Sequence, residues 1–511
     1  MKWPHNPIIY EINTWVWLRT LSQHYGKRIT LNTVPDEVLD HLASYQFDSI
    51  WLMGVWHRGP STRASALNYI HEYVGALPGI TEKDVGGSAY AIGNYEVERA
   101  LGGRSGLKSI RKRLAQRGMR LILDYVPNHT GHDHPWLREH PEYYMQGTED
   151  LIVSDADSFL RVETVQGEDA IIARGRDPYF PSWIDTAQLN AFDQGYRDAC
   201  VETLCDMASV SDGVRCDMAM LMMNDIFVRT WGWLGVQPPE IDFWNYVVPR
   251  VKQRYPDFIF IAEVYWDMNY SILQQGFDYT YDKTMYDRLR DGDVGGVYAH
   301  LGADISYLER NIRFIENHDE PRAADAFGIE RSRPAAVLVN TVPGATLLHD
   351  GQFQGRVIKL PVQINRQPVE RDHPELRDFY LRLQQEASDE IYRSGEWRLF
   401  RAYAACDDCV GDYNLVTYGW RLGDDYRVIV LNMSDERSQA LIDLGAWNDV
   451  LGTHDWVLQD ALHGTYREVE GEVLDADGLM VDMKGYQAVI YHMRPVKKHR
   501  RRHTQRERSM A

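Results

Sequence analysis

Acidic and other polar side chains close four apolar, strand-like runs of this chain. The runs are LILDYVPNH, DGVRCDMAM, FIAEVYW and FIENHDE, and they carry Asp124, Arg215, Asp217, Glu263 and Asp319. Carboxylates gathered at one place repel one another, and burial of an unpaired carboxylate costs free energy. A purely structural role would therefore be hard to maintain, and the pattern indicates a reaction that needs several acids.

Two carboxyl groups are the minimum set for hydrolysis of a glycosidic bond, because one protonates the leaving oxygen and the other, ionised, attacks or activates water. Arg215 lies two residues before Asp217, on the same side of a strand, and would keep that Asp ionised by direct pairing. Glu263 follows the apolar run FIFIA and has no basic residue within several positions, a setting that raises a carboxyl pKa. We therefore expect Asp217 to attack and Glu263 to protonate.

The elements that would position these residues alternate between short β-rich runs and amphipathic helical patterns. The helical patterns include residues 34–45, 106–117 and 191–209, where apolar residues recur at spacings of three and four. Eight strands in this alternation predict an α/β fold, a parallel (β/α)8 TIM barrel with its chemistry at the C-terminal ends of the strands. The expected strands are residues 8–17, 47–55, 119–126, 213–218, 258–265, 277–281, 312–316 and 345–349.

Other stretches break this rhythm and predict further domains. We expect the barrel to comprise residues 1–129 and 190–390, interrupted after its third strand by an irregular inserted subdomain, residues 130–189, which is rich in His, Pro, Asp and Gly. Residues 396–495 predict a C-terminal β-sandwich, with strand-like segments at 413–420, 426–432, 479–483 and 488–493. Residues 496–511 are expected to form a basic, disordered tail.

Composition limits the partners and the location. The formal net charge is -19, and the basic run at the C-terminus leaves the remainder still more acidic, so we expect no nucleic-acid partner. No window holds the roughly 20 uninterrupted apolar residues of a membrane helix, and the N-terminus lacks a secretion-signal pattern. We therefore expect no membrane association and a cytoplasmic location, while the sequence does not specify an oligomeric state. The five cysteines, including the lone CxxC of Cys406 and Cys409, are expected to be reduced.

The four runs that carry the acids resemble the signature regions of the α-amylase family, glycoside hydrolase family 13. The family pattern D-x-V-x-N-H matches residues 124–129, G-x-R-x-D matches residues 213–217, the acid/base Glu matches Glu263, and N-H-D matches residues 317–319. All four occur in family order. Residues 130–189 look like the family's domain B, and the expected sandwich is similar to its C-terminal domain.

This resemblance implies a small-molecule carbohydrate substrate and a retaining double displacement. Asp217 would form the glycosyl-enzyme intermediate, Glu263 would act as acid and then as base, and Asp319 would hold the sugar hydroxyls and favour an oxocarbenium-like transition state. Arg215 would orient Asp217. The other substrate-binding residues that the resemblance implies are Tyr90, at the family's stacking position, Asp124, His129 and His318. Trp266 is expected to be either a substrate platform or a packing residue at the barrel rim.

No cofactor or metal is required by this chemistry. Asn128 matches a family calcium ligand, which keeps calcium as an alternative, but no partner carboxylates are visible and we favour a structural hydrogen bond. His132, Asp133 and His134 are similar to a metal cluster, although ordinary loop polarity is the favoured interpretation.

Departures from the family bear on the substrate. Met220 and Leu221 replace the Lys and His that follow the nucleophile in typical endo-amylases, and NHDEPR resembles a stretch of oligosaccharide α-glucosidases, which favours short substrates. Against this, those glucosidases place an Asp where this chain has Gly87. We consider a hydrolase of α-glucosidic oligosaccharides of the α-amylase/α-glucosidase type, a transglycosidase for glucosyl or maltosyl transfer (trehalose or maltose conversion), and a catalytically silent sugar-binding relative. The intact carboxylate triad speaks against the third.

Overall fold

The computed structural model of the protein describes residues 3–406 and 409–496. The chain forms two compact units: the first comprises residues up to 290, 304–329 and 343–384, and the second comprises residues 291–303, 330–342 and those from 385 onward. Apart from Val496, the expected basic tail lies outside the described residues.

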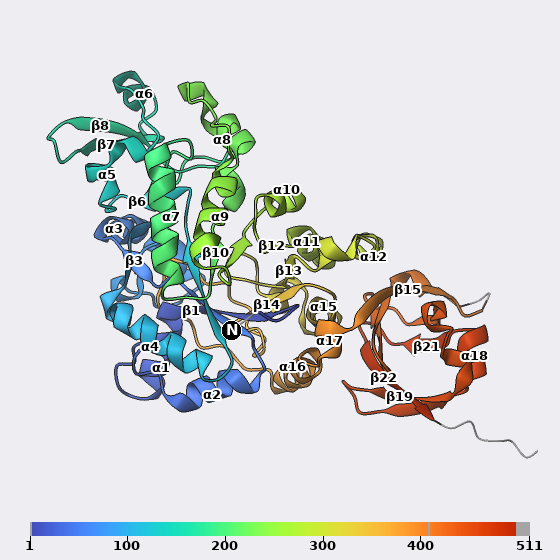
Figure 1. The fold of residues 1–511 in the computed structure, drawn as a ribbon. Helices are drawn as coiled ribbons and strands as arrows, with labels where there is room; N and C mark the ends of the chain where they lie inside the picture. Colours follow the sequence, from blue (N-terminus) through green and yellow to red (C-terminus); the bar gives the residue numbers. More distant parts are fainter. Residues whose placement is uncertain (1–2, 407–408, 497–511) are drawn as a thin grey trace, which may run out of the picture. The chain divides into compact units, whose positions relative to one another are not determined.

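Eight parallel strands close a barrel in the first unit, which confirms the predicted fold class (Figure 1). Around the barrel the strands follow the order β1-β14-β13-β12-β11-β10-β5-β2. Almost every strand residue is buried, as expected for a parallel sheet that is covered on both faces. The strands are β1 Ile8–Asn13, β2 Ser49–Met53, β5 Arg120–Tyr125, β10 Gly213–Cys216, β11 Ile259–Ala262, β12 Tyr279–Tyr281, β13 Asn311–Arg313 and β14 Ala345–His349.

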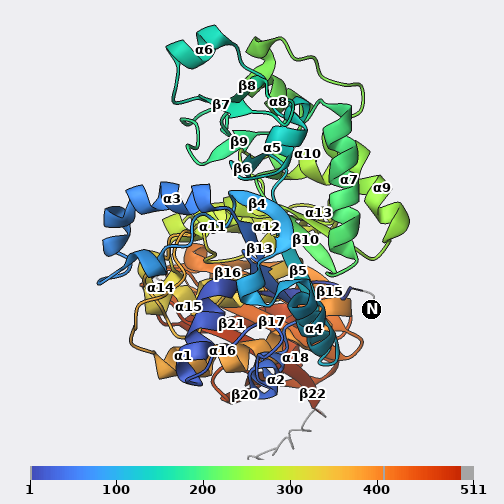
Figure 2. The ribbon, with the colours of Figure 1, turned by 90° about the vertical axis from the view of Figure 1, so that its left-hand side faces the viewer.

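The main helices lie between these strands in the chain. The expected helices at 34–45, 106–117 and 191–209 correspond to α2 (Asp36–Ser44), α4 (Gly103–Ala115) and α7 (Gln194–Ala208). Helix α7 lies beside α9 (Phe243–Arg254), as Figures 1 and 2 both show. Further helices are α1 Thr14–His24, α11 Lys283–Asp291, α12 Val294–Leu301, α15 Ile329–Thr341 and α16 Pro374–Ala387.

The first strand is shorter than predicted. It ends at Asn13, and α1 begins at Thr14, so the expectation of strand through Trp17 is wrong. The side-chain oxygen of Asn13 accepts a hydrogen bond from the backbone N–H of Val16 at 3.3 Å, which caps the helix. This cap turns a run of β-favouring residues, TWVW, into the first turn of a helix.

An insert follows the third barrel strand, as the fold prediction expects. Strand β6 (His129–Gly131) pairs antiparallel with β9 (Thr186–Gln188), and between them lie α5 (Trp136–Glu139), α6 (Glu149–Ser154) and the hairpin β7 (Phe159–Glu163) to β8 (Asp169–Ala173). The hairpin and α6 project at the same end of the barrel as α8 (Asn224–Trp231), which follows the carboxyl end of β10 (Figures 1 and 2). The insert therefore stands at the end where the acids are expected.

The second unit contains the antiparallel C-terminal sandwich. Strand β15 takes part in both of its sheets, because residues 396–400 pair with β16 and residues 401–404 pair with β18. Phe400, Val428, Ile442 and Trp456 are among the residues of its apolar core. The strands are β15 Glu396–Ala404, β16 Leu415–Leu422, β17 Asp425–Asn432, β18 Ser438–Asp443, β19 Asp455–Asp460, β20 Tyr466–Val469, β21 Leu479–Met483 and β22 Ala488–Val496.

The cysteines correct one expectation. Cys406 and Cys409 form a disulfide rather than two free thiols, because a turn with a hydrogen bond from Cys409 N–H to Cys406 C=O brings their Cα atoms to 5.0 Å. Cys200, Cys205 and Cys216 are free and buried, as expected. Within the described residues, no helix is both long and apolar enough to cross a membrane.

Candidate active site

Strand register brings two of the acids to the same level. Cys216 of β10 pairs with Ala262 of β11, and Asp217 and Glu263 are the next residues along each strand. The backbone N–H of Glu263 donates to the Cys216 carbonyl at 3.0 Å. Asp217 and Glu263 are therefore neighbours at the carboxyl end of the barrel, where the fold places active sites.

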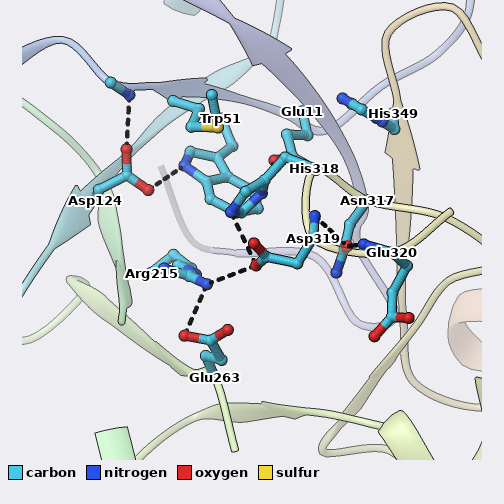
Figure 3. A network of polar contacts seen from close by, with 12 residues as sticks. Glu11, Trp51, Asp124, Arg215, Glu263, Asn317, His318, Asp319, Glu320 and His349 are labelled. Carbon is cyan, nitrogen blue, oxygen red and sulfur yellow. Dashed lines mark hydrogen bonds and ion pairs between the residues drawn. The ribbon is translucent and has the colours of Figure 1, made fainter. Parts of the chain in front are cut away.

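Arg215 is the cation at the centre of the acids. Its guanidinium lies 2.6 Å from Asp217 Oδ1, 2.8 Å from Glu263 Oε2 and 3.6 Å from Asp319 Oδ2, and its side chain is only 1% exposed. Figure 3 shows it between Glu263 and Asp319. The rings of Trp51, Tyr90 and Tyr281 lie 5.2 to 5.7 Å from the guanidinium carbon. One buried positive charge thus holds three carboxylates together.

Glu263 has the protonation behaviour of a general acid. Burial raises its pKa to about 7, although the adjacent Arg215 works in the opposite direction. Its two oxygens accept hydrogen bonds from the N–H of Met218 at 2.6 Å and from the hydroxyl of Tyr265 at 2.8 Å. The sequence predicted that Glu263 has no basic neighbour, which is wrong because Arg215 contacts it in the folded chain. The predicted rise of its pKa agrees with the structure, because burial outweighs Arg215.

Asp319 has a charged partner of its own, His318. The imidazole Nε2 lies 2.9 Å from Asp319 Oδ2, and Nδ1 lies 2.5 Å from Glu11 Oε1 on β1. Burial alone would lower the pKa of His318, but the two carboxylates raise it well above its usual value. In turn, His318 and Arg215 outweigh burial and hold the pKa of Asp319 well below its usual range. Asp319 is therefore a permanent negative charge.

Asp124 and Tyr90 complete this wall of the site. Asp124 accepts hydrogen bonds from Trp51 Nε1 at 3.0 Å and from the backbone N–H of Gly54 at 2.8 Å (Figure 3), and burial raises its pKa to about 6. The Tyr90 ring stacks on His318 at 5.3 Å between centroids, with its hydroxyl 2.8 Å from His318 Nε2. The Tyr90 hydroxyl also lies 3.5 Å from Asp124 Oδ1, so the two side chains belong to one polar network with His318 and Asp319.

The remaining two predicted site residues, His129 and Trp266, are not among the ion pairs around Arg215. His129, on β6, is buried, and burial lowers its pKa while the charge of Asp217 opposes this shift. Trp266 is 37% exposed and, with Met218 and Tyr265, lines a separate pocket of about 460 Å³ next to Glu263. Trp266 and Asp267 both have positive φ (61° and 56°), a backbone strain that is concentrated at functional sites.

Sequence reasoning missed Glu11, Trp51 and Tyr265. The sequence offered a signal for Glu11, because a charged residue inside the apolar run IIYEIN is unusual. It lies within a strand, however, and the prediction considered residues at strand ends. Met220 and Leu221 are buried in a short 3-10 helix (Ala219–Met222), so they do not face the cleft. Gly87 has φ of +87°, and a Cβ there would lie 2.8 Å from the backbone N of Arg63, so this backbone excludes an Asp.

Asn128 forms hydrogen bonds with Gln188, a residue of β9. The Asn128 side-chain oxygen accepts a hydrogen bond from Gln188 Nε2 at 2.9 Å, and its amide nitrogen lies 3.3 Å from Gln188 Oε1. Asn128 therefore makes the structural hydrogen bond that the sequence favoured. In the described part of the chain, no group of three or more His, Cys, Asp or Glu has metal-binding geometry, His132 to His134 included.

Comparison with known proteins finds similarity to α-amylases. A family model for the "Alpha amylase, catalytic domain" matches residues 31–173. The chain is 26% identical over 483 residues to alpha-amylase MalA of Haloarcula japonica, which covers 92% of this chain and 60% of that protein. It is 23% identical over 386 residues to alpha-amylase 3 of Dictyoglomus thermophilum, covering 72% and 67%.

The fold agrees as well. The crystal structure of the noncanonic maltogenic alpha-amylase AmyB from Thermotoga neapolitana matches with a TM-score of 0.67 at 20% identity, covering 96% of this chain and 99% of that one. The chain is therefore similar to α-amylases in part of its sequence and in its fold. It spans 60% of the length of the haloarchaeal relative.

Proposed function

We propose that this protein is a retaining α-glycoside hydrolase that acts on short α-glucosidic oligosaccharides. The observation that carries the proposal is the buried pair of Asp217 and Glu263, both bound to Arg215, in which Glu263 has a pKa of about 7. A carboxyl group that is protonated near neutral pH, next to an Asp whose charge Arg215 balances, is the pair that a double displacement needs.

The reaction uses the pair twice. In the first step an Asp217 oxygen attacks the anomeric carbon, the glycosidic C–O bond breaks, and the Glu263 proton moves to the leaving oxygen. In the second step the Glu263 carboxylate takes a proton from water, the water oxygen attacks the anomeric carbon, and Asp217 is released. Asp319, held ionised by His318 and Arg215, stabilises the positive charge that develops on the sugar ring.

The stereochemistry of the first product tests this proposal. We expect ¹H NMR during early hydrolysis of maltotriose to show the α-anomer first, because two inversions restore the configuration. Asp217→Asn should lose about 10⁴-fold or more in kcat, whereas Asp206→Asn, which changes an exposed carboxylate on α7, should stay within twofold of the parent, a difference of about 0.4 kcal/mol. A β-anomer as the first product, or a fully active Asp217→Asn variant, would contradict the proposal.

A second candidate is transfer of the glycosyl group to a sugar instead of water. The pocket of about 460 Å³ beside Glu263 favours it, because its lining includes exposed Trp266 and the charged side chains of Asp177 and Lys283, which suit a sugar ring and its hydroxyls. Maltose at high concentration distinguishes the two reactions. Products longer than maltose would show transfer, and glucose alone would show hydrolysis.

A further inference from the structure

Two long excursions of the chain meet beside the carboxylates. The first runs from β3 (Trp56–Arg58) to β4 (Ile92–Val97) and contains α3 (Pro60–Asn68), and the second, residues 350–373, joins β14 to α16. Val85 and Ile364 form an antiparallel bridge between them. Two backbone hydrogen bonds of 2.8 Å flank the bridge, Gly86 N–H to Gln363 C=O and Asn365 N–H to Asp84 C=O. We call these joined segments, residues 79–90 and 356–367, the end wall.

An apolar cluster anchors the end wall to the rest of the first excursion. Ile364 is fully buried among residues of the first excursion, and Leu360 packs against the same cluster. Burial of the apolar side chains of these residues stabilises the contact by roughly several kcal/mol. The two segments therefore form a stable contact in the folded protein. The buried members of the cluster are Ala66, Tyr73, Leu77, Val85 and Ile364.

Charged contacts fix the end wall to the barrel. Asp84, 2% exposed, accepts hydrogen bonds from Arg366 at 3.0 Å and from Arg19 of α1 at 2.7 Å. Arg366 holds the pKa of Asp84 well below its usual range. Arg58, also buried, donates to the side-chain oxygen of Asn365 at 3.2 Å. Arg19 of α1 and Arg58 of β3 therefore hold the end wall in place, because its displacement would break these hydrogen bonds.

The end wall touches the catalytic residues directly. Tyr90, at the end of its first segment, stacks on His318, and Lys359, in its second segment, donates to the backbone carbonyl of Asp319. Between the second segment and His318 the chain leaves a cavity of about 30 Å³, lined also by Asn13 and Asn317. Such a cavity holds about two water molecules and no sugar ring.

The other side of the carboxylates is open. The pocket of about 460 Å³ begins at Met218 and Tyr265, the two residues that hydrogen-bond Glu263, and extends to Trp266 and Lys283. Glu263 protonates the leaving group, so this is the side from which the leaving part of the substrate departs. The carboxylates thus have the end wall on one side and this pocket on the other.

We propose that the end wall closes the donor side of the cleft, so that the enzyme attacks glucan chains from their non-reducing ends and does not cleave inside a chain. This inference rests on the proposed glycosidase function. A donor sugar bonded to Asp217 beside Asp319 would have the end wall on the side of Lys359 and Tyr90, so a chain that continued on that side would meet residues 356–367. Chain ends fit this cleft, and chain interiors do not.

A pair of substrates tests the inference without any variant. Both are maltoheptaosides of the same length, and one carries a 4,6-O-ethylidene group on its non-reducing glucose. We expect the free substrate to be shortened from its end, and cleavage of any bond in the blocked substrate to be at least about 100-fold slower in kcat/KM. Equal rates on the two substrates would overturn the inference while leaving the glycosidase intact. Cleavage of neither would overturn the proposed function itself.

Opening the wall gives a second test. Arg366→Ala removes the contact with Asp84, and Ile364→Ser weakens the apolar core; for either variant that remains folded, the rate on blocked relative to free substrate should rise about tenfold. The matched control is Arg104→Ala, which breaks an exposed Arg–Asp pair with Asp206 on the barrel's outer helices and should leave the ratio unchanged. An unchanged ratio in a folded wall variant would contradict the role of the end wall.

Discussion

At the scale of single residues, the surroundings of each carboxylate set its protonation, because Arg215 contacts all three. It contacts Asp217 and Glu263 at nearly the same distance, yet burial leaves Glu263 with a pKa of about 7, while Asp319 has a second cation, His318, and stays ionised. The acids differ because their surroundings differ, not because their side chains do. This division of labour makes a prediction about pH.

The first prediction is that kcat/KM falls as pH rises through about 7. Burial raises the pKa of Glu263 in the folded protein, so the proton that the leaving group needs is present below that pH and is lost above it. Above the pKa the rate should fall about tenfold per pH unit. Glu263→Gln should lose activity on maltotriose far more than on α-glucosyl fluoride, whose leaving group needs no proton, and should lack the alkaline limb. A flat profile from pH 6 to 9 would remove Glu263 as the acid.

The second prediction concerns Glu11, which acts through His318 as a positioning residue. In Glu11→Gln, His318 keeps only one carboxylate partner, so its pKa falls and it becomes neutral as pH rises. A hydrogen bond to a charged group contributes about 1.5–3 kcal/mol, so kcat/KM should fall about 10- to 100-fold, more at pH 8 than at pH 6. Glu142→Gln, which removes an exposed carboxylate–His140 pair, is the control. A loss that did not depend on pH would indicate a merely structural role.

Much of the candidate site was predictable because its polar side chains lie at or just after the carboxyl ends of the barrel strands. Asp124, Arg215, Asp217, Glu263 and Asp319 meet as the strand pattern predicted. Contacts across the barrel were not predictable, because Glu11 reaches His318 over a separation of 307 residues. The direction of a side chain after the strand was not predictable either, since Met220 and Leu221 turn into the core.

At the scale of elements, the junction of β1 and α1 shows where local pattern fails. The run IIYEINTWVW is continuous in β-favouring residues, so periodicity alone extends the strand through Trp17. The strand stops because Asn13 caps a helix, an interaction that needs one side-chain oxygen and no change in hydrophobicity. By contrast, the eight strand cores were predictable, because buried parallel strands are uniformly apolar.

The third prediction tests this cap. Asn13→Ala should lower the free energy of unfolding by about 1 kcal/mol, because the N–H of Val16 loses its acceptor. Asn13→Ser, which supplies another capping oxygen, should keep most of the parent's stability. Urea unfolding followed by circular dichroism measures both. If the Asn13→Ser and Asn13→Ala variants were equally destabilised, loss of the cap would not be the cause of the lower stability.

At the scale of the whole molecule, only part of the sandwich was predictable from the sequence. The expected strands at 413–420, 426–432, 479–483 and 488–493 correspond to β16, β17, β21 and β22, whereas β15, β18, β19 and β20 were missed. Strand β20 lies at a sheet edge and exposes half of its residues, and β15 carries three charged residues. Such strands bury little apolar area, so their sequences carry little pattern.

The last prediction concerns what holds the second unit together. Glu386 is 8% exposed, and its oxygens lie 3.1 Å from Arg427 Nε on β17 and 2.7 Å from His492 Nε2 on β22. Burial would raise the pKa of Glu386, but His492 and Arg427 outweigh it and lower the pKa. A lowered pKa means that this stabilisation is present above the unfolded value, about 4.3, and is lost as pH falls through the folded one.

Removing that carboxylate should therefore destabilise the second unit locally. Glu386→Gln leaves Arg427 buried with Asp389, at 3.4 Å, as its remaining carboxylate partner among the described residues, and breaking a buried pair costs about 3–5 kcal/mol. We expect hydrogen exchange on the full chain to show lost protection in β17 and β22 and unchanged protection in β5 and β10. Asp449→Asn breaks the exposed pair with Arg421. It should change the free energy of the opening that permits exchange by less than about 1 kcal/mol. Equal effects of the two variants would mean that the buried network contributes no more than a surface ion pair.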